Sequence, residues 1–467
     1  MNSRAEELRG KHPRFVYESF VLERAADRLR ISFRFRLEPD IVFTPDIVIE
    51  SIGRSAIDSL PPAALESFAF HLGLIEMMSY WKAAAPREVA IEAGALNESQ
   101  LQWWKELWLR GMGEFFYVNQ IDFRSPDYLK ISARSPDLPG PGQLRRGRRP
   151  ARRSLVMVSG GKDSAIALHE LRAAGEEFNC LLLNPPPCAV EVAAIAGCTD
   201  PIIVRRSLDP RLLDLNRAGY LNGHTPFSAL LAILGITCAA LFDYDRVVVS
   251  NERSSDEGNV HFLGAEINHQ YSKTLAFETA MREYARAYLA PDISYFSILR
   301  PLFELQVCRL FAACREYFAA FRSCNRGQKE GRWCGRCPKC LSVFICLAPF
   351  LSRDELVGIF SRDLFEPADA MPLLRSLLGM EGPKPFECVG TRQELLVGLF
   401  LSVKRRKEAH APLPSLLAQV EREILPAQHD LPALSTAILS AWSENNYLPP
   451  ELAALLKAQV GASDDAG

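Results

Sequence analysis

SLVMVSGGKDSAIALHEL, residues 154–171, interrupts an apolar run with a polar, glycine-containing loop and then continues as a helix-forming run. The apolar part, Leu155–Val158, predicts a buried strand, and the alanine- and leucine-rich part predicts a helix. Two adjacent glycines allow backbone N–H groups to approach an anion, and the dipole of the following helix favours negative charge there. Serine hydroxyls and a lysine add further donors. This glycine loop consists of Ser159, Gly160, Gly161, Lys162, Asp163 and Ser164.

The glycine loop fits one known phosphate-binding pattern. The Walker A spacing and the dinucleotide-binding glycine fingerprint are both absent. At every fixed position the loop resembles Ser-Gly-Gly-x-Asp-Ser, the pyrophosphate loop of the N-type, or PP-loop, ATP pyrophosphatases. That resemblance implies ATP as co-substrate, cleavage between its α- and β-phosphates with Mg²⁺, and adenylation of a carboxyl or carbonyl oxygen. From the residues alone, the alternative is a Gly-Gly turn whose aspartate or serine caps the helix.

Four of the 12 cysteines are clustered in SCNRGQKEGRWCGRCPKC with the spacing C-x9-C-x2-C-x2-C. These are Cys324, Cys334, Cys337 and Cys340. Four thiolates can close a tetrahedron around Zn²⁺ and form a structural site. An iron–sulfur cluster and unligated thiols are the alternatives. The arrangement is similar to the zinc-binding cysteines of the deazaguanine nitrile synthases (the 7-cyano-7-deazaguanine synthase family), which also belong to the pyrophosphatase superfamily.

Strand and helix patterns divide the chain around these motifs. After Ser154, strand-like runs alternate with helical runs, which favours a parallel sheet covered by helices. The strand candidates are Leu155–Val158, Cys180–Leu183, Ile202–Val204 and Val247–Ser250. We predict an α/β fold: a parallel-sheet PP-loop ATP pyrophosphatase (adenine nucleotide alpha hydrolase-like) domain with an N-terminal α+β domain and a helical C-terminal extension. The predicted regions are 1–135 (N-terminal α+β domain), 136–153 (Pro/Gly/Arg-rich linker), 154–350 (PP-loop domain with the cysteine cluster) and 351–467 (helical C-terminal region).

The N-terminal region combines a strand pattern with two apolar helix patterns. RLRISFRFRLEP, Arg28–Pro39, alternates apolar and polar residues, as a half-buried strand does. The stretches 65–84 and 98–120 predict helices. The second stretch contains three tryptophans: Trp103, Trp104 and Trp108. They could line a ligand pocket, but aromatic residues at helical spacing favour core packing.

Composition narrows the classes of partner. The net charge of −2 over 467 residues gives no whole-molecule attraction to nucleic acid or to an acidic membrane surface. The first residues lack the apolar core of a secretory leader, and no apolar run approaches the roughly 18 residues of a spanning helix. The cysteines outside the cluster are expected to be buried hydrophobes in a reducing compartment. We therefore expect a cytoplasmic protein with a small-molecule substrate and without a membrane or nucleic-acid partner.

Four further stretches resemble the bacterial UDP-N-acetyl-α-D-muramoyl-L-alanyl-L-glutamate epimerase family. They are AFHLGLIEMMSYWKAA (69–84), NGHTPFSALLA (222–232), SNERSSDEGNVHFLGAEINHQYSKTLAFE (250–278) and KPFECVGTRQELL (384–396). The resemblance covers nearly the whole chain. It implies an enzyme of peptidoglycan precursor synthesis that uses ATP and Mg²⁺ to invert the terminal L-Glu of UDP-MurNAc-L-Ala-L-Glu.

The implied use of ATP follows from the chemistry of a carboxylate. Removing the α-proton beside a free carboxylate would create two adjacent negative charges. Converting the carboxylate to an acyl-adenylate removes one charge and lets the developing enolate delocalise. A general base can then take the proton, and reprotonation on the other face inverts the centre.

Polar residues in the loop after the predicted strand 247–250 are candidates for this chemistry, because ligands bind at the carboxyl ends of strands in open α/β sheets. Residues of the glycine loop and His224, before a predicted long helix, are further candidates. The catalytic candidates are Asp163, Lys162, Glu252, His269 and Lys273. The substrate-binding candidates are His224, Asn251, Asn268 and Tyr271. Asp163 or Glu252 could hold Mg²⁺ through oxygen ligation. For each residue alone, a cap or surface role is the alternative. Cys308 is a more distant candidate for proton transfer.

Two other functions compete with the epimerase. One is a synthase or ligase that adenylates a carboxylate or base carbonyl and then transfers an amine or sulfur, as in deazaguanine or tRNA modification. The other is a zinc-ribbon module that binds nucleic acid without catalysis. The intact glycine loop argues against the second, because a binding module has no use for it.

Overall fold

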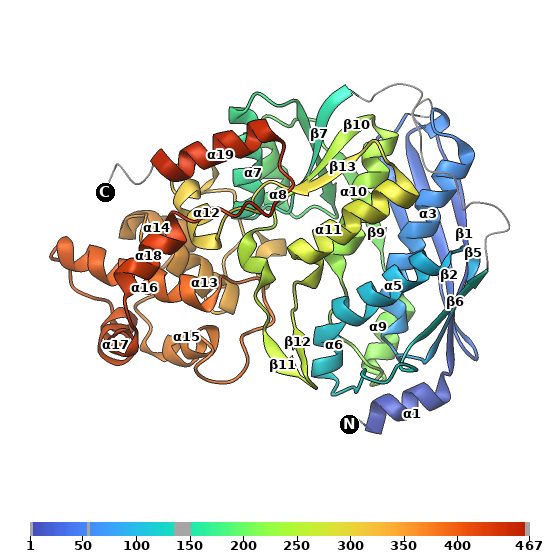
Figure 1. Ribbon diagram of the computed structural model, residues 1–467, viewed down its shortest axis with the longest axis horizontal. Coiled ribbons are helices and arrows are strands. Elements are labelled where there is room, and N and C mark those ends of the chain that lie inside the picture. Colours follow the sequence, from blue (N-terminus) through green and yellow to red (C-terminus); the bar gives the residue numbers. More distant parts are fainter. Residues whose placement is uncertain (1–2, 54–56, 135–150, 463–467) are drawn as a thin grey trace. The chain divides into compact units, whose positions relative to one another are not determined.

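The computed structural model describes residues 3–53, 57–134 and 151–462, which form a mixed α/β protein with a helical C-terminal region (Figure 1). The chain forms two compact units that alternate along the sequence. Unit 1 comprises Met1–Leu155, Ile202–Val247 and His261–Tyr295, and unit 2 comprises Val156–Pro201, Val248–Val260 and Phe296–Gly467. The predicted regions follow one another in chain order and therefore differ from these units. All but the last three residues of the predicted linker 136–153 lie outside the described residues.

Unit 1 contains the N-terminal strands and the helices that pack on them. Its strands are β1 (Arg14–Arg24), β2 (Arg28–Leu37), β3 (Ile41–Phe43), β4 (Asp46–Glu50), β5 (Glu88–Ala95), β6 (Lys130–Arg134), β9 (Ile202–Ser207) and β12 (Ala265–Ile267). Its helices are α1 (Ser3–Lys11), α3 (Pro62–Glu76), α4 (Met78–Trp81), α5 (Glu98–Gly111), α6 (Gly113–Val118), α9 (Pro210–Arg217), α10 (Phe227–Leu241), α11 (Leu275–Tyr284) and the 3-10 turn η2 (Tyr271–Lys273).

Unit 2 contains the glycine loop and the C-terminal helices. Its elements include α7 (Lys162–Ala173), β8 (Phe178–Leu183), α8 (Pro187–Ile195), η1 (Arg253–Asp256), α12 (Glu304–Phe311), α13 (Pro338–Leu347), α14 (Arg353–Phe360), α15 (Met371–Leu377), α16 (Arg392–Glu408), α17 (Ser415–Glu423), α18 (Leu431–Leu439) and α19 (Pro450–Ala462). Four strands run from one unit into the other: β7 (Ala151–Met157), β10 (Tyr244–Val249), β11 (Val260–Phe262) and β13 (Ser294–Ser297).

The sheet of unit 1 is mixed, with the strand order β9-β4-β2-β1-β5-β6. β1 and β5 are parallel, as are β5 and β6, whereas β1 and β4 both lie antiparallel to β2. Every second residue of β2 is buried, which confirms the alternation predicted for Arg28–Pro39. β9, predicted as a strand after the glycine loop, lies antiparallel to β4, with Asp46 opposite Ser207.

Unit 1 has an aromatic core. α3 packs on β1 and is buried along almost its whole length. Trp104 and Trp108 are fully buried, and the indole of Trp103 donates to the carbonyl of Ala280, so the prediction of core packing is confirmed. The Tyr284 hydroxyl accepts a hydrogen bond from Trp104 Nε1 at 2.9 Å. It also lies 2.9 Å from Nε2 of His71, which completes a buried polar network.

Acidification should destabilise unit 1 in part through His71. Burial lowers the pKa of this imidazole to about 4, while the unfolded chain regains an ordinary histidine. Between pH 6.5 and 4 the unfolded state therefore binds a proton that the folded state does not, and stability falls as the pH falls. At pH 5 this group alone should cost about 2 kcal/mol. Urea unfolding at pH 7.5 and 5.0 tests this. Between these two pH values His71→Gln should lose about 2 kcal/mol less stability than wild type does. Equal losses in the two proteins would contradict the prediction.

Unit 2 is built on the connection β7–α7–β8. β7 and β8 are neighbours in the sheet, and α7 joins them. A helix between two neighbouring strands is the type of connection that parallel strands need. α12 packs on α7 and α13, and α13 packs on α16. Ser352 and Thr391 form capping boxes at the starts of α14 and α16, which confirms helices predicted for the C-terminal region. Among the described residues, no helix is long and apolar enough to cross a membrane.

Candidate active site

The glycine loop joins the end of β7 to the start of α7, in the predicted strand–loop–helix context. Gly160 has a φ of +82°, and a Cβ there would lie 2.6 Å from the backbone nitrogen of Ala189, so only glycine fits. Gly161 is the N-cap residue of α7, and no side chain caps the helix. The alternative of a turn capped by aspartate or serine therefore does not hold. The loop offers backbone N–H groups at a helix N-terminus, which is an arrangement that binds anions.

The serines of the glycine loop hold its shape. The backbone nitrogen of Ser159 donates to Ser164 Oγ at 3.1 Å, and the two hydroxyl oxygens lie 3.2 Å apart. The carbonyl of Gly160 accepts from the backbone nitrogen of Arg322 at 2.8 Å. The Ser159 side chain remains exposed, so its hydroxyl is accessible to a ligand.

Lys162 lies at the centre of a buried charge cluster. The cluster consists of Lys162, Asp163, Glu252, Glu304 and Lys339. The Lys162 ammonium is fully buried and lies 3.3 Å from Glu304 Oε1 and 3.6 Å from Glu252 Oε2, and it also pairs with Asp163. Lys339 Nζ lies 3.9 Å from Glu304 Oε1. The structure thus brings three of the predicted catalytic residues together and directs the lysine toward carboxylates.

The surroundings shift the pKa values of the two glutamates in the buried charge cluster in opposite directions. Burial, followed by the charge of Glu304, raises the pKa of Glu252 well above its usual value. Burial opposes ionisation of Glu304 as well, but Lys162 and Lys339 outweigh it and lower the pKa of Glu304 to about 2. Glu252 is therefore the member of the pair that can carry a proton at neutral pH. Cys308 is fully buried beside Glu304, so it is a packed side chain.

The chain segment around Glu252 is fixed by the C-terminal stretch 384–396. Ser254 Oγ donates to Glu394 Oε1 at 3.0 Å, and Lys384 Nζ lies 2.7 Å from Glu257 Oε1. The predicted substrate residue Asn251 uses its backbone carbonyl to accept from the Ser297 hydroxyl. Two stretches that carry the family resemblance thus form one packed structure in unit 2.

Unit 1 holds a second group of functional side chains, a histidine cluster formed by Glu114, His224 and His269. Glu114 lies on α6, and the histidines lie in loops before α10 and after β12. Glu114 Oε2 is 2.5 Å from His269 Nδ1 and 3.7 Å from His224 Nδ1. The two imidazole rings have centroids 4.4 Å apart. Each of the three side chains is between 15% and 23% exposed, so the cluster is sheltered but accessible.

The other predicted residues near the histidine cluster have distinct surroundings. Asn268 Oδ1 accepts from the backbone nitrogen of Gln270, which shapes the turn after His269. The Tyr271 ring lies under the guanidinium of Arg110 at 5.4 Å, and burial raises the pKa of its phenol. Lys273 ends η2 and exerts a positive field on His224. The predicted candidates therefore divide between the buried charge cluster and the histidine cluster.

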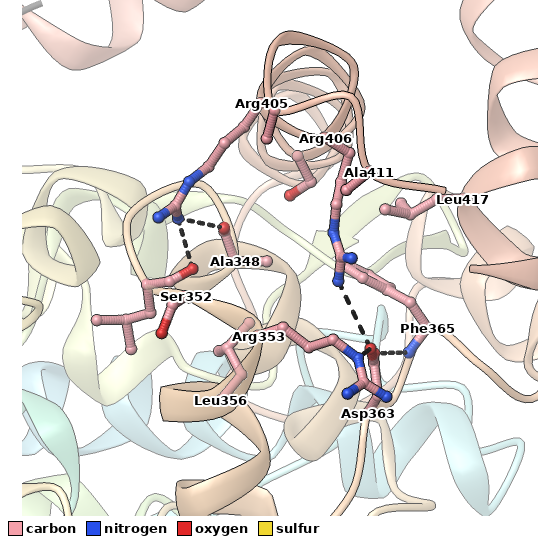
Figure 2. Close-up of a pocket in the computed structure, with 13 residues that line it drawn as sticks. Ala348, Ser352, Arg353, Leu356, Asp363, Phe365, Arg405, Arg406, Ala411 and Leu417 are labelled. Carbon is pink, nitrogen blue, oxygen red and sulfur yellow. Dashed lines mark hydrogen bonds and ion pairs between the residues drawn. The ribbon is translucent and has the colours of Figure 1, made fainter. Parts of the chain in front are cut away.

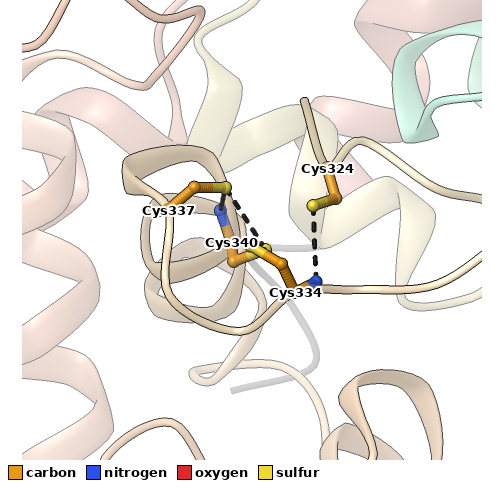
Figure 3. Close-up of side chains that lie close together, drawn as sticks. All are labelled: Cys324, Cys334, Cys337 and Cys340. Atoms are coloured by element: carbon orange, nitrogen blue, oxygen red, sulfur yellow. Dashed lines mark hydrogen bonds between the residues drawn. The ribbon is translucent and has the colours of Figure 1, made fainter. Parts of the chain in front are cut away.

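The four clustered cysteines converge on one point in unit 2 (Figure 3). Their sulfur atoms all lie within 4.8 Å of one another, with 3.5 Å between Cys337 and Cys340 and 3.7 Å between Cys334 and Cys340. A tetrahedron with metal–sulfur bonds of about 2.3 Å has sulfur–sulfur edges of about 3.8 Å. Backbone N–H groups of Gly327 and Cys334 donate to Cys324 Sγ. The four residues fit a single metal ion.

A separate pocket in unit 2, with a volume of about 220 Å³, is lined by arginines (Figure 2). Arg405 donates to the carbonyls of Ala348, Pro349 and Leu351 at the end of α13. Arg353 and Arg406 both approach Asp363. These guanidinium groups already have protein partners, so the pocket is a weaker candidate than the two clusters.

Comparison with known families decides the assignment. A model of the MurL N-terminal domain matches residues 6–298, more than half of the chain, and a model of the MurL C-terminal domain matches residues 320–430. The chain belongs to the MurL family. The glycine loop and the histidine cluster lie within the match to the MurL N-terminal domain, and the four clustered cysteines lie within the match to the MurL C-terminal domain.

Three curated relatives confirm the family resemblance, and each is named UDP-N-acetyl-alpha-D-muramoyl-L-alanyl-L-glutamate epimerase. The relative from Micromonospora sp. is 37% identical over 363 residues, which cover 75% of this chain and 78% of the relative. The relative from Xanthomonas oryzae pv. oryzae is 36% identical over 392 residues, 82% of this chain and 83% of the relative. The relative from Salinispora tropica is 36% identical over 353 residues, 74% and 75% of the two chains.

Sequence reasoning missed three charged residues of this MurL-family site: Glu114, Glu304 and Lys339. Glu304 stands alone in the apolar run PLFELQVC, and Lys339 stands between two clustered cysteines. A charge inside such a run is a signal for a buried ion pair, because an unpaired charge would be costly there. Glu114 precedes an aromatic run in GMGEFF and carries no comparable local signal.

Proposed function

We propose that this MurL-family chain is an ATP-dependent epimerase that inverts the terminal L-Glu of UDP-MurNAc-L-Ala-L-Glu to D-Glu, a step in peptidoglycan precursor synthesis. The observation that carries the proposal is the identity of 36–37% with three epimerases over about three quarters or more of each chain. The glycine loop supports the use of ATP. We also assign β7–α7–β8 to a PP-loop pyrophosphatase fold, which the loop sequence and its uncapped helix favour.

In the proposed reaction, the terminal α-carboxylate attacks the α-phosphate of ATP and forms an acyl-adenylate with release of pyrophosphate. Adenylation lowers the pKa of the C–H group at the glutamate α-carbon. The enolate formed from the adenylate carries one negative charge fewer at the carboxyl group than the enolate formed from a free carboxylate. A base removes the α-proton, and a proton returns to the opposite face. Water then hydrolyses the adenylate to AMP and the epimerised peptide.

The residues of unit 2 fit the groups that this reaction needs. Backbone N–H groups of the glycine loop would bind the pyrophosphate end of ATP, where the dipole of α7 favours negative charge. Asp163 and Glu252 are the oxygen donors that would hold Mg²⁺, with Glu252 releasing its proton on binding the ion, and the charge of Mg²⁺ would stabilise the leaving pyrophosphate. The four clustered cysteines would hold Zn²⁺ as a structural ion, because all four positions of the tetrahedron are taken by sulfur.

Incubation in deuterated water tests the proposed function. With ATP, Mg²⁺ and UDP-MurNAc-L-Ala-L-Glu, the protein should form AMP, pyrophosphate and D-glutamyl product that carries deuterium at the glutamate α-carbon. AMP without deuterium uptake would contradict the epimerase and favour a ligase. No AMP with this or any other carboxylate substrate would contradict the use of the loop as an ATP site.

A pair of glycine variants assigns the activity to the loop. Gly160→Ala should abolish both AMP formation and deuterium uptake, because its Cβ would collide with the backbone of α8. Gly175→Ala is the matched control, since Gly175 also has a positive φ of +67° but nothing lies within 4 Å of its Cβ position. The control should therefore share the backbone strain and keep the activity.

A further inference from the structure

The histidine cluster of unit 1 lies outside the glycine loop, and its side chains are of the types that transfer protons in enzymes. The proposed epimerisation needs a group that takes the α-proton of the adenylated glutamate. Assigning residues to this step rests on that proposed function. It is carried by the geometry of Glu114, His224 and His269.

Glu114 holds His269 in the arrangement of a general base. The 2.5 Å contact between Glu114 Oε2 and His269 Nδ1 requires the imidazole to donate from Nδ1. In that tautomer, the basic lone pair of the neutral ring is on Nε2. The carboxylate also stabilises the imidazolium that forms when Nε2 takes a proton. A base oriented by a carboxylate is a recurring arrangement in enzymes that transfer protons.

Small residues allow the three elements of the cluster to approach. A Cβ on Gly111 would lie 2.8 Å from Pro226, two residues after His224, and a Cβ on Gly113 would lie 3.2 Å from Ile267, two residues before His269. Lys82 donates to the carbonyl of Gly223 at 2.6 Å and so fixes the loop that carries His224. Close packing at the end of α5 and the start of α6 therefore places both histidine loops beside Glu114.

His224 complements His269 as a neutral imidazole. Burial lowers the pKa of His224 to about 3, and the positive fields of His269, Lys273 and Lys82 act in the same direction. His224 is therefore uncharged at neutral pH. Its ring lies against that of His269, with centroids 4.4 Å apart.

The lysines around the cluster favour an anion over a metal ion. The charges of Lys82 and Lys273 both lower the pKa of His224, and the charge of Glu114 opposes the lowering of the Lys82 pKa by burial. Two ammonium groups and one carboxylate leave a net positive charge beside the neutral imidazoles. That charge would repel a divalent cation, whereas it would stabilise the enolate oxygen that develops when the α-proton leaves.

We propose that His269, oriented by Glu114, is the catalytic base that removes the glutamate α-proton, with Lys82 and Lys273 stabilising the enolate. The C–H electron pair passes to the acyl oxygen as His269 Nε2 takes the proton. A water molecule then protonates the carbon on its opposite face as the electron pair returns from the acyl oxygen, and the imidazolium gives its proton to the resulting hydroxide. Glu114 acts as a positioning residue.

The test separates adenylation from proton transfer. His269→Asn keeps an amide near the position of Nδ1 for Glu114 but removes the basic Nε2. It should reduce deuterium uptake at the glutamate α-carbon by about 100-fold or more. Substrate-dependent exchange of labelled pyrophosphate into ATP, which measures adenylation alone, should stay within threefold of wild type (roughly 0.7 kcal/mol). Retained exchange also shows that the variant is folded and binds both substrates.

Glu114→Gln tests the positioning role. It should lower kcat for deuterium uptake by less than His269→Asn does, leave KM for the peptide substrate close to wild type, and shift the pH profile of uptake. Undiminished deuterium uptake in His269→Asn would overturn the proposal. So would a parallel loss of pyrophosphate exchange, since His269 would then serve binding or folding. A second metal equivalent in wild type that His224→Ala loses would also overturn it. Absence of any deuterium uptake by wild type would instead contradict the proposed function.

Discussion

Replacing Lys162 by methionine should lower the free energy of unfolding by about 3–5 kcal/mol, because it leaves buried carboxylates without their shared counter-ion. The Lys162 ammonium is fully buried and faces Glu304, Glu252 and Asp163. Methionine fills a similar volume but cannot neutralise Glu304, which would have to take up a proton or remain as an unpaired charge. Lys339 is the remaining cation of the cluster and is 3.9 Å from Glu304.

The loss should depend on pH in a defined direction. In wild type the pKa of Glu304 is lowered to about 2, so this group adds stability above its unfolded pKa near 4.5 and that contribution is lost as the pH falls. Without Lys162, burial is expected to raise the pKa of Glu304 instead. The variant should then be penalised most at high pH, and the difference from wild type should grow between pH 5 and 8.

Urea unfolding without ATP provides the measurement. Lys457→Met is the matched control, since the Lys457 side chain is 57% exposed and its ion pair with Glu444 should contribute little. The double variant Lys162→Met with Glu304→Gln should recover part of the lost stability, because it removes a buried charge together with its partner. An unfolding midpoint for Lys162→Met equal to that of wild type would contradict the prediction.

The glycine loop and the cysteine cluster were predictable because their functional groups are neighbours in the sequence. The six loop residues lie on one strand–loop–helix connection, and three of the four cysteines lie within seven residues of one another. Local sequence determines such geometry, since turn and helix preferences act over a few residues. The structure therefore added little to their positions, although it showed that Gly161, and no aspartate or serine, is the N-cap residue.

The histidine cluster and the division into units depend on contacts that local patterns do not specify. His224 and His269 were candidates by residue type, but Glu114 became part of the cluster only once α6 lay beside both loops. Likewise β9 was recognised as a strand, whereas its pairing with β4 depends on which sheet edge is available. Strand register and partner choice follow from the whole buried face of a sheet, which a short pattern does not contain.

Removal of the proposed metal ion from the four clustered cysteines should unfold the surrounding part of unit 2 and abolish the proposed ATP turnover with it. Structural Zn²⁺ binds zinc-finger peptides with about 10–16 kcal/mol, so losing even part of this exceeds most side-chain effects. Cys337 is the N-cap residue of α13, and its sulfur accepts from the backbone nitrogen of Cys340. Lys339, between these two cysteines, reaches Glu304 of the buried charge cluster. Loss of the ion would therefore disturb the start of α13 and the charges beside the glycine loop together.

Elemental analysis and thermal unfolding test this coupling. Fresh protein should contain one zinc per chain, and Cys337→Ser should lose the ion, unfold at a lower temperature and form no AMP. Cys238→Ser is the matched control, because Cys238 is a fully buried cysteine on α10 outside the cluster and its replacement should leave the metal content unchanged. Iron with acid-labile sulfide would replace the zinc assignment by an iron–sulfur cluster. Less than one metal ion per chain, with normal ATP turnover, would show that the four thiols pack without a ligand.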